Sequence, residues 1–308
     1  MKAILGGLAV VVFAAPLTSL LLAAEPTERL PQLTVVAKLK EKNFQIVTLD
    51  VKGENLAAVE GLPPGAREPN WSADGKQLLF VLEAEGAPQI WRSRLDGKEP
   101  TRLTNFSSRL QQPVWSPGSD KIAFTLVQDG GANHEIFAID ADGSNAANLT
   151  NHPSFDADAS WSPDGKRILF TSNRNGAFRL FVMDADGTSV RQISEVNLAG
   201  WVYPSWSPDG AQVLFGGPRP DQTRQVFVAN ADGQGIEPLT EGPGVNAYPA
   251  WSPDGRYIAY LHFDKRPDQS PEGGRLKILD LDTGEHAEIA PDDMRCAAAP
   301  IAWRPASK

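Results

Sequence analysis

The sequence repeats itself about every 45 residues, and each copy is centred on a tryptophan followed by a tight-turn motif. The repeated tryptophans are Trp71, Trp115, Trp161, Trp206, Trp251 and Trp303. In the third copy the motif is Ser160-Trp161-Ser162-Pro163-Asp164-Gly165, and the sixth copy is the shortened Ala302-Trp303-Arg304-Pro305. A period of this length accommodates four short strands and their turns, which is the size of one β-propeller blade.

The residues inside one repeat follow the order expected for such a blade. The segment Ser-Pro-Asp-Gly favours a type I turn, because proline fixes φ at the second position and glycine suits the fourth. An alternating strand is predicted next, at Arg167–Thr171, and a third strand at Leu180–Asp184. The dipeptide Asp186-Gly187 then predicts a hairpin, and a short fourth strand ends near Ile193.

The two ends of the chain together predict one further blade. Three strand-like runs without a tryptophan strand precede Trp71, namely Leu33–Leu39, Phe44–Asp50 and Asn55–Val59, and little chain follows Trp303. Pairing of the first strands with the last would close the ring and remove open sheet edges. We therefore predict an all-β fold, a six-bladed propeller with four-stranded antiparallel blades, in a single domain over residues 25–308.

The first 24 residues differ from the rest of the chain. Lys2 is followed by an uncharged run, Ala3–Ala24, that ends in small residues at Leu22-Ala23-Ala24. This pattern predicts a signal peptide and a periplasmic or secreted protein. The run is also long enough to serve as an uncleaved membrane anchor, so that alternative stays open.

Charge and cysteine content restrict the partners. The formal net charge is −9, and the sequence has no basic stripe of the kind that nucleic-acid binders carry. We therefore expect no nucleic-acid partner, whereas a basic ligand surface or a divalent cation is compatible with the acidic balance. Cys296 is the only cysteine, so an internal disulfide is excluded.

The repeated motifs resemble those of a known family. Trp-Ser-Pro-Asp-Gly, then Phe170–Gly176 and Leu180–Gly187, is similar to the TolB propeller family over residues 33–308. The resemblance implies a periplasmic propeller that binds an envelope protein, as the family's namesake binds the peptidoglycan-associated lipoprotein. The namesake also has a separate amino-terminal domain. Here only 46 residues separate Ala24 from Trp71, and the closing blade needs most of them.

Candidate site residues stand at fixed positions before each tryptophan, where the blades stop resembling one another. In a propeller, ligands bind at the channel mouth, and we expect these positions on loops that enter the innermost strands. Three residues before the tryptophan stand Glu68, Gln112, Asp158, Tyr203 and Tyr248. Two residues earlier stand Asp156, Trp201 and Asn246, among others. We take these eight as candidate ligand-binding residues, although divergence also arises where loops are unpacked.

Two chemistries fit these residues. Glu68, Asp156 and Asp158 are a candidate metal site for calcium, which prefers several oxygen ligands, although the two aspartates also suit turn capping. Trp201, Tyr203 and Tyr248 could instead form an aromatic platform for a peptide or a sugar, or simply pack between blades. The repeated tryptophans themselves are predicted to pack between blades.

The sequence contains no catalytic signature. The four histidines fall at different blade positions, and neither a nucleophile elbow nor a phosphate-binding glycine loop is present. His152 is the histidine predicted nearest the channel. We therefore predict a monomeric scaffold that binds a protein or peptide in the cell envelope. The alternatives are a metal-dependent hydrolase or lyase that acts on a carbohydrate or peptide, and an anchored structural protein.

Overall fold

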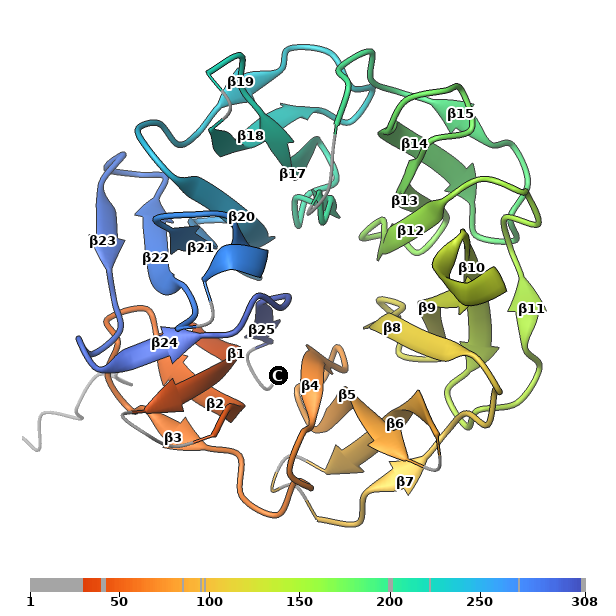
Figure 1. The fold of residues 1–308 in the computed structure, drawn as a ribbon, viewed down its shortest axis with the longest axis horizontal. Coiled ribbons are helices and arrows are strands. Elements are labelled where there is room, and N and C mark those ends of the chain that lie inside the picture. The colour runs from red at the N-terminus through yellow and green to blue at the C-terminus, as the bar shows by residue number, and fades with distance from the viewer. Residues whose placement is uncertain are drawn as a thin grey trace, which may run out of the picture.

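The repeats form a ring of β-sheets around a central axis in the computed structural model of the chain (Figure 1). The structure describes residues 30–39, 43–84, 86–94, 96, 98–198, 202–221, 223–270 and 272–305. The predicted signal peptide, residues 1–24, lies outside the described residues. The all-β propeller fold predicted from the repeat is confirmed.

Five blades follow the chain in order. Blade 1 contains β4 (Arg67–Trp71), β5 (Gln77–Ala84), β6 (Ala87–Arg94) and β7 (Thr101–Arg102). Blade 2 contains β8 (Arg109–Trp115), β9 (Lys121–Gln128), β10 (Asn133–Asp140) and β11 (Ala147–Asn148). Blade 3 contains β12 (Asp156–Trp161), β13 (Arg167–Ser172), β14 (Arg179–Asp184) and β15 (Arg191–Gln192). Blade 4 contains β16 (Ser205–Trp206), β17 (Gln212–Pro218), β18 (Arg224–Asn230) and β19 (Glu237–Pro238). Blade 5 contains β20 (Val245–Trp251), β21 (Tyr257–Phe263), β22 (Arg275–Asp280) and β23 (His286–Glu288).

The sixth sheet, the closing blade, joins the two ends of the chain. It contains β1 (Gln32–Leu39), β2 (Gln45–Asp50), β3 (Ala57–Ala58), β24 (Met294–Cys296) and β25 (Ala302–Arg304). β25 pairs with β1 through Leu33 and Trp303, and β24 pairs with the other end of β1 through Ala37 and Cys296. Figure 1 shows the red and orange strands of the amino-terminal end beside the blue strands of the carboxyl-terminal end. The sequence analysis did not predict β24.

The repeated turn explains why each tryptophan strand reverses where it does. In blade 3 the Ser162 hydroxyl donates to Oδ1 of Asp164 at 2.6 Å, and the same oxygen accepts from the Lys166 N–H at 3.1 Å. The Gly165 N–H donates to the Ser162 carbonyl, and Gly165 has a φ of 70° that suits glycine. The Ser, Asp and Gly of the motif therefore each satisfy one requirement of the turn.

The core lies between blades, so the middle strands are buried on both sides. The largest fully buried side chains include Phe80, Phe124, Phe170, Phe181, Phe215 and Phe263. Trp161 is 8% exposed and packs in one hydrophobic cluster with Ile136 of blade 2 and Phe170 of blade 3. The tryptophans therefore pack between neighbouring blades, as the sequence predicted.

None of the helices in the described ranges is long and apolar enough to cross a membrane. The helices that those ranges contain are two short 3-10 turns, η1 (Asp129–Gly131) and η2 (Pro267–Gln269), both in loops between strands.

Candidate functional site: the central channel

The innermost strands carry a bulge at one repeated position. The register of β4 against β5 shifts between Arg67 and Asn70, and the corresponding shift occurs in β8, β12 and β20. The first residue inside each bulge has a left-handed backbone, and Tyr203, just before β16, shares it. The φ values are 55° at Glu68, 57° at Gln112, 61° at Asp158, 43° at Tyr203 and 56° at Tyr248.

This backbone conformation is uncommon for residues other than glycine, and its recurrence requires support from the surrounding structure. The bulge interrupts the strand and redirects its side chains. We expected these five residues on loops at the channel mouth. Glu68, Gln112, Asp158 and Tyr248 instead lie within strands, partway along the channel. A proline stands two residues before the tryptophan in three of the four bulged strands, β4, β8 and β20.

The five residues surround a cavity of about 180 Å³ in the channel. Four of them, Glu68, Gln112, Asp158 and Tyr203, line it directly, and Tyr248 stacks on Tyr203 with ring centroids 4.5 Å apart. Prolines that the sequence analysis did not single out complete the wall, namely Pro69, Pro113, Pro204, Pro249 and Pro300. The wall therefore combines carboxylates, an amide and aromatic rings with an apolar proline surface.

Gln112 links the two acidic residues of the cavity. Its backbone N–H donates to Oε2 of Glu68 at 2.5 Å, and its side-chain Nε2 donates to Oδ1 of Asp158 at 2.5 Å. The hydroxyl of Thr125, on β9, donates to Oε1 of Gln112 at 3.2 Å and so fixes the orientation of the amide. The backbone N–H of Tyr203 bonds to Asp158 in turn. Each carboxylate is thus held by the left-handed residue of the following blade.

Burial controls the ionisation of these acids. Loss of solvent raises the pKa of Asp158 to about 6, against the opposing effect of its hydrogen bonds from Gln112 and Tyr203, and the charge of Glu68 raises it further. The Glu68 side chain is 12% exposed, and burial likewise raises its pKa. Arg67 is the cation that approaches Glu68, with Nε 3.7 Å from Oε1. With a pKa of about 6, Asp158 is mostly ionised at neutral pH, so the cavity contains negative charge.

The two tyrosines beside these acids stay neutral. Burial raises the pKa of Tyr203 well above its ordinary value, and that of Tyr248 is raised for the same reason. Tyr248 is 2% exposed and also packs near Phe263. Both hydroxyl groups therefore remain protonated at physiological pH. They interact with each other, and the Tyr203 hydroxyl also interacts with Gln112.

The remaining candidate residues do not line this cavity. Asp156 is fully buried and forms an ion pair with Arg174 at 2.9 Å. Asn246 is 3% exposed, and it bonds to Gln225 at 2.7 Å and to Nδ1 of His262 at 2.8 Å. Trp201 lies outside the described residues.

His152 also lies away from the cavity, and its ring accepts a hydrogen bond from a neighbouring backbone N–H at Ser154. The structure does not bring Glu68, Asp156 and Asp158 together as one ligand set. Across the described ranges, no group of three or more histidine, cysteine or acidic side chains is placed to hold a metal ion. The calcium site stays a prediction.

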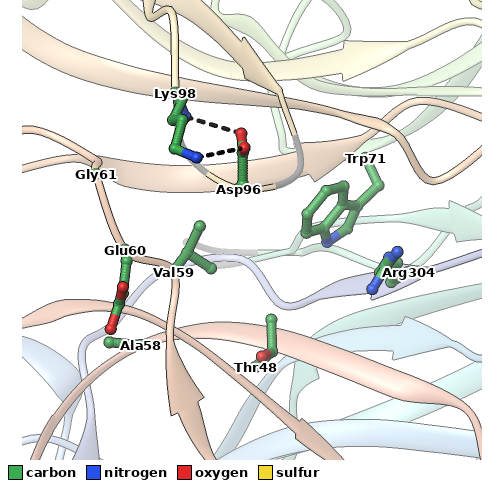
Figure 2. Close-up of a pocket in the computed structure, with 9 residues that line it drawn as sticks. All are labelled: Thr48, Ala58, Val59, Glu60, Gly61, Trp71, Asp96, Lys98 and Arg304. Atoms are coloured by element: carbon green, nitrogen blue, oxygen red, sulfur yellow. Dashed lines mark hydrogen bonds and ion pairs between the residues drawn. The ribbon is translucent and has the colours of Figure 1, made fainter.

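A larger cavity, of about 500 Å³, lies between blade 1 and the closing blade (Figure 2). Figure 2 shows Lys98 paired with Asp96 on one side of it and Arg304 beside Trp71 on another. The Lys98 Nζ is 3.3 Å from Asp96, and the Arg304 guanidinium lies 5.4 Å from the Trp71 ring centroid. The two cations that line this larger cavity therefore already have partners. None of the candidate residues from the sequence lines it. The channel is the stronger candidate site.

Comparison with known proteins gives consistent results. The model of the TolB β-propeller domain matches residues 31–219. The Tol-Pal system protein TolB of Alcanivorax borkumensis is 30% identical over 88 residues, which are 28% of this chain and 20% of that protein. The uncharacterized peptidase YuxL of Bacillus subtilis is 35% identical over 60 residues, which are 19% of this chain and 9% of that protein. These matches span a fifth or less of each relative.

Among solved structures, TolB from Acinetobacter baumannii superimposes with a TM-score of 0.72. The superposition covers 90% of this chain and 67% of that chain, at 21% sequence identity. At this identity the likeness shows the shared propeller fold alone.

Proposed function

The chain belongs to the TolB β-propeller domain family, and from this premise we propose that it is a protein- or peptide-binding scaffold of the cell envelope. The ligand binds in the central channel, at the ring formed by Glu68, Gln112, Asp158, Tyr203 and Tyr248. The observation that carries the proposal is that Glu68, Gln112, Asp158 and Tyr203, from four different blades, line one cavity, with Tyr248 of a fifth blade stacked on Tyr203. Ligand sites combine an apolar wall with a few convergent polar groups, and this cavity has both.

The envelope location has separate support. The Alcanivorax relative is a Tol-Pal system protein, and the uncharged segment Ala3–Ala24 is typical of an export signal. A cavity of about 180 Å³ is small for a whole ligand. A partner protein would therefore place one or two side chains in the channel and rest its remaining surface on the rim.

Site-specific photo-crosslinking tests this function. A photoreactive phenylalanine analogue replaces Tyr203 in one variant, and in the control it replaces Ala287, an exposed residue of the outermost strand β23. We expect irradiation of envelope preparations to yield a protein adduct with the Tyr203 variant, and excess unmodified chain to suppress it. Adducts of equal yield from both positions, or none from Tyr203, would contradict binding in the channel.

A further inference from the structure

The topology places the acidic turns of all blades at one end of the ring. In an antiparallel blade, the turn after the first strand and the turn after the third strand lie at the same end. Hydrogen bonds join the two turns, as between the Ala185 N–H and the Lys166 carbonyl at 2.9 Å. We call this end the Asp-Gly face. Its turns contain Asp74, Asp96, Asp120, Asp140, Asp142, Asp164, Asp186, Asp209, Asp232, Asp254, Asp280 and Asp282.

Hydrogen bonds within the turns stabilise the ionised form of several of these carboxylates. The Ser162 hydroxyl and the Lys166 N–H lower the pKa of Asp164, and Ser207 does the same for Asp209. Cations compensate some of the charge, as where Lys121 pairs with Asp140 at 2.8 Å. A cleft bordered by charged groups concentrates their field.

The channel cavity occupies the half of the channel that is nearest to this face. In blades 1 to 5, each residue that lines it lies at the left-handed position or between that position and the tryptophan, as Asp158 to Ser160 do in β12. The tryptophan leads directly into the acidic turn. A ligand that approaches the Asp-Gly face therefore meets the cavity before it meets the far end of the channel.

The side chains that line the cavity favour a cationic ligand. Glu68 and Asp158 receive hydrogen bonds from Gln112, and Tyr203 lines the same cavity. Two carboxylates in one cavity attract a positive charge. Ser205 also lines the cavity, and its buried hydroxyl has no hydrogen-bond partner among the described residues.

We propose that the partner of this scaffold inserts one lysine or arginine side chain into the channel from the Asp-Gly face, where Glu68 and Asp158 bind its charged group. The inference rests on the proposed function and adds the chemistry of the partner. An organic cation fits better than a metal ion for two reasons. Gln112 already donates to both carboxylates, and the proline wall offers contact to an aliphatic stem rather than further oxygen ligands.

Short peptides provide the test. The probes are acetylated and amidated Gly-Ser-Xaa-Ser-Gly peptides with lysine, arginine, norleucine or glutamate at Xaa, titrated at millimolar concentration in buffer that contains EDTA. NMR shifts of the Gln112 side-chain amide report binding in the channel. We expect the lysine and arginine peptides to bind at least about tenfold more tightly than the norleucine peptide, which corresponds to about 1.4 kcal/mol. The glutamate peptide should bind more weakly still.

Two matched double variants locate the charge. Glu68→Gln with Asp158→Asn should reduce the affinity for the lysine peptide about tenfold, to that of norleucine. Glu241→Gln with Asp292→Asn removes the same charge from exposed positions away from the channel, and should leave the affinity within about twofold. Circular dichroism establishes that both variants are folded.

The outcomes separate this inference from the proposed function. Four results would each overturn the inference that a basic side chain binds. They are equal binding of the lysine and norleucine peptides, tighter binding of the glutamate peptide, no binding of the basic peptides, and full affinity in the Glu68→Gln, Asp158→Asn variant. The crosslinking at Tyr203 depends on none of these peptides. A Tyr203 adduct together with a glutamate preference would keep the channel-binding function and reverse the charge of the partner.

Discussion

At the scale of single residues, the channel is defined by side chains that the backbone holds in an unfavourable conformation. Asp158 combines a left-handed φ of 61° with burial and with a hydrogen bond from Gln112. Each of these features is costly or restrictive by itself, and such features concentrate at functional sites. These features agree with the binding role that we propose for the ring, and burial of its acids lowers the stability of the unbound protein.

Asp158→Asn should make the free protein more stable at neutral pH. The pKa of Asp158 is raised to about 6, so the folded state holds this proton more tightly than the unfolded state does. This group's contribution to stability accordingly falls as the pH rises from about 4 through about 6. We expect the variant to melt a few degrees higher than the parent at pH 7.5, with the difference shrinking toward pH 4.5. Thermal melts across this range measure it, and a variant that is less stable at pH 7.5 would contradict the effect.

At the scale of elements, neighbouring blades touch through the hairpin glycines. A Cβ on Gly187, in the hairpin after β14, would lie 2.5 Å from the carbonyl oxygen of Leu149 in blade 2. A Cβ on Gly143 would likewise meet the carbonyl oxygen of Leu103 in the preceding blade, and a Cβ on Gly233 would meet that of Ile193. The Asp-Gly dipeptide therefore serves two purposes. It forms the hairpin, and it lets one blade approach the backbone of the next.

Gly187→Ala should destabilise the protein more than Gly176→Ala. Both glycines have a φ of 88°, so both substitutions incur a similar backbone cost of about 1 kcal/mol. A Cβ on Gly176 would meet nothing within 4 Å, whereas the one on Gly187 would collide with the Leu149 carbonyl. Denaturant unfolding of the two variants isolates the contact between blades. Equal free energies of unfolding would show that the blades can move apart without cost.

Two of the repeated tryptophans differ in the hydrogen bonding of their indole N–H. The Trp71 Nε1–H donates to the Thr34 hydroxyl at 2.8 Å, whereas Nε1 of Trp206 has no hydrogen-bond partner among the described residues. An arginine stacks on each ring, Arg304 on Trp71 and Arg167 on Trp206. Because Trp71→Phe also removes the hydrogen bond, it should cost about 1 kcal/mol more than Trp206→Phe. Equal losses of unfolding free energy in urea titrations would mean that this bond to the closing blade adds no net stability.

At the scale of the whole molecule, stability depends on the junction of the two chain ends. β1 forms antiparallel pairs with β2, β24 and β25, so one strand joins both ends of the sequence. Trp303 is 8% exposed in the largest hydrophobic cluster, which also contains residues of blade 5. An open ring would expose this cluster and leave a strand edge unpaired.

A chain that ends at Ile301 should melt far below the full chain, because it loses β25 and the Trp303 side chain. Trp303→Ala keeps the strand and loses only the packing, at about 3–5 kcal/mol, so its midpoint should fall between the two. Thermal melts with a dye that binds exposed apolar surface give this order. If the shortened chain melts with the full chain, ring closure does not stabilise the fold.

Much of the fold follows from local sequence. The interval between tryptophans sets the blade, because four strands and three turns need about that many residues. Ser162, Asp164 and Gly165 determine their turn through contacts within a few positions. Such short-range contacts can be predicted from the sequence. The sequence also identified four of the residues that line the channel cavity as candidate site residues.

What only the tertiary structure decided is which side chains meet. Asp156 and Asp158 are two residues apart, yet the first pairs with Arg174 and the second faces the channel. The bulge in β12 and the partners supplied by other blades produce this separation. The hydrogen bond that Glu68 accepts likewise comes from Gln112, which is 44 positions away in the next blade. The sequence alone determined the blades and their turns, because those depend on neighbours along the chain, whereas the chemistry of the channel depends on neighbours across the ring.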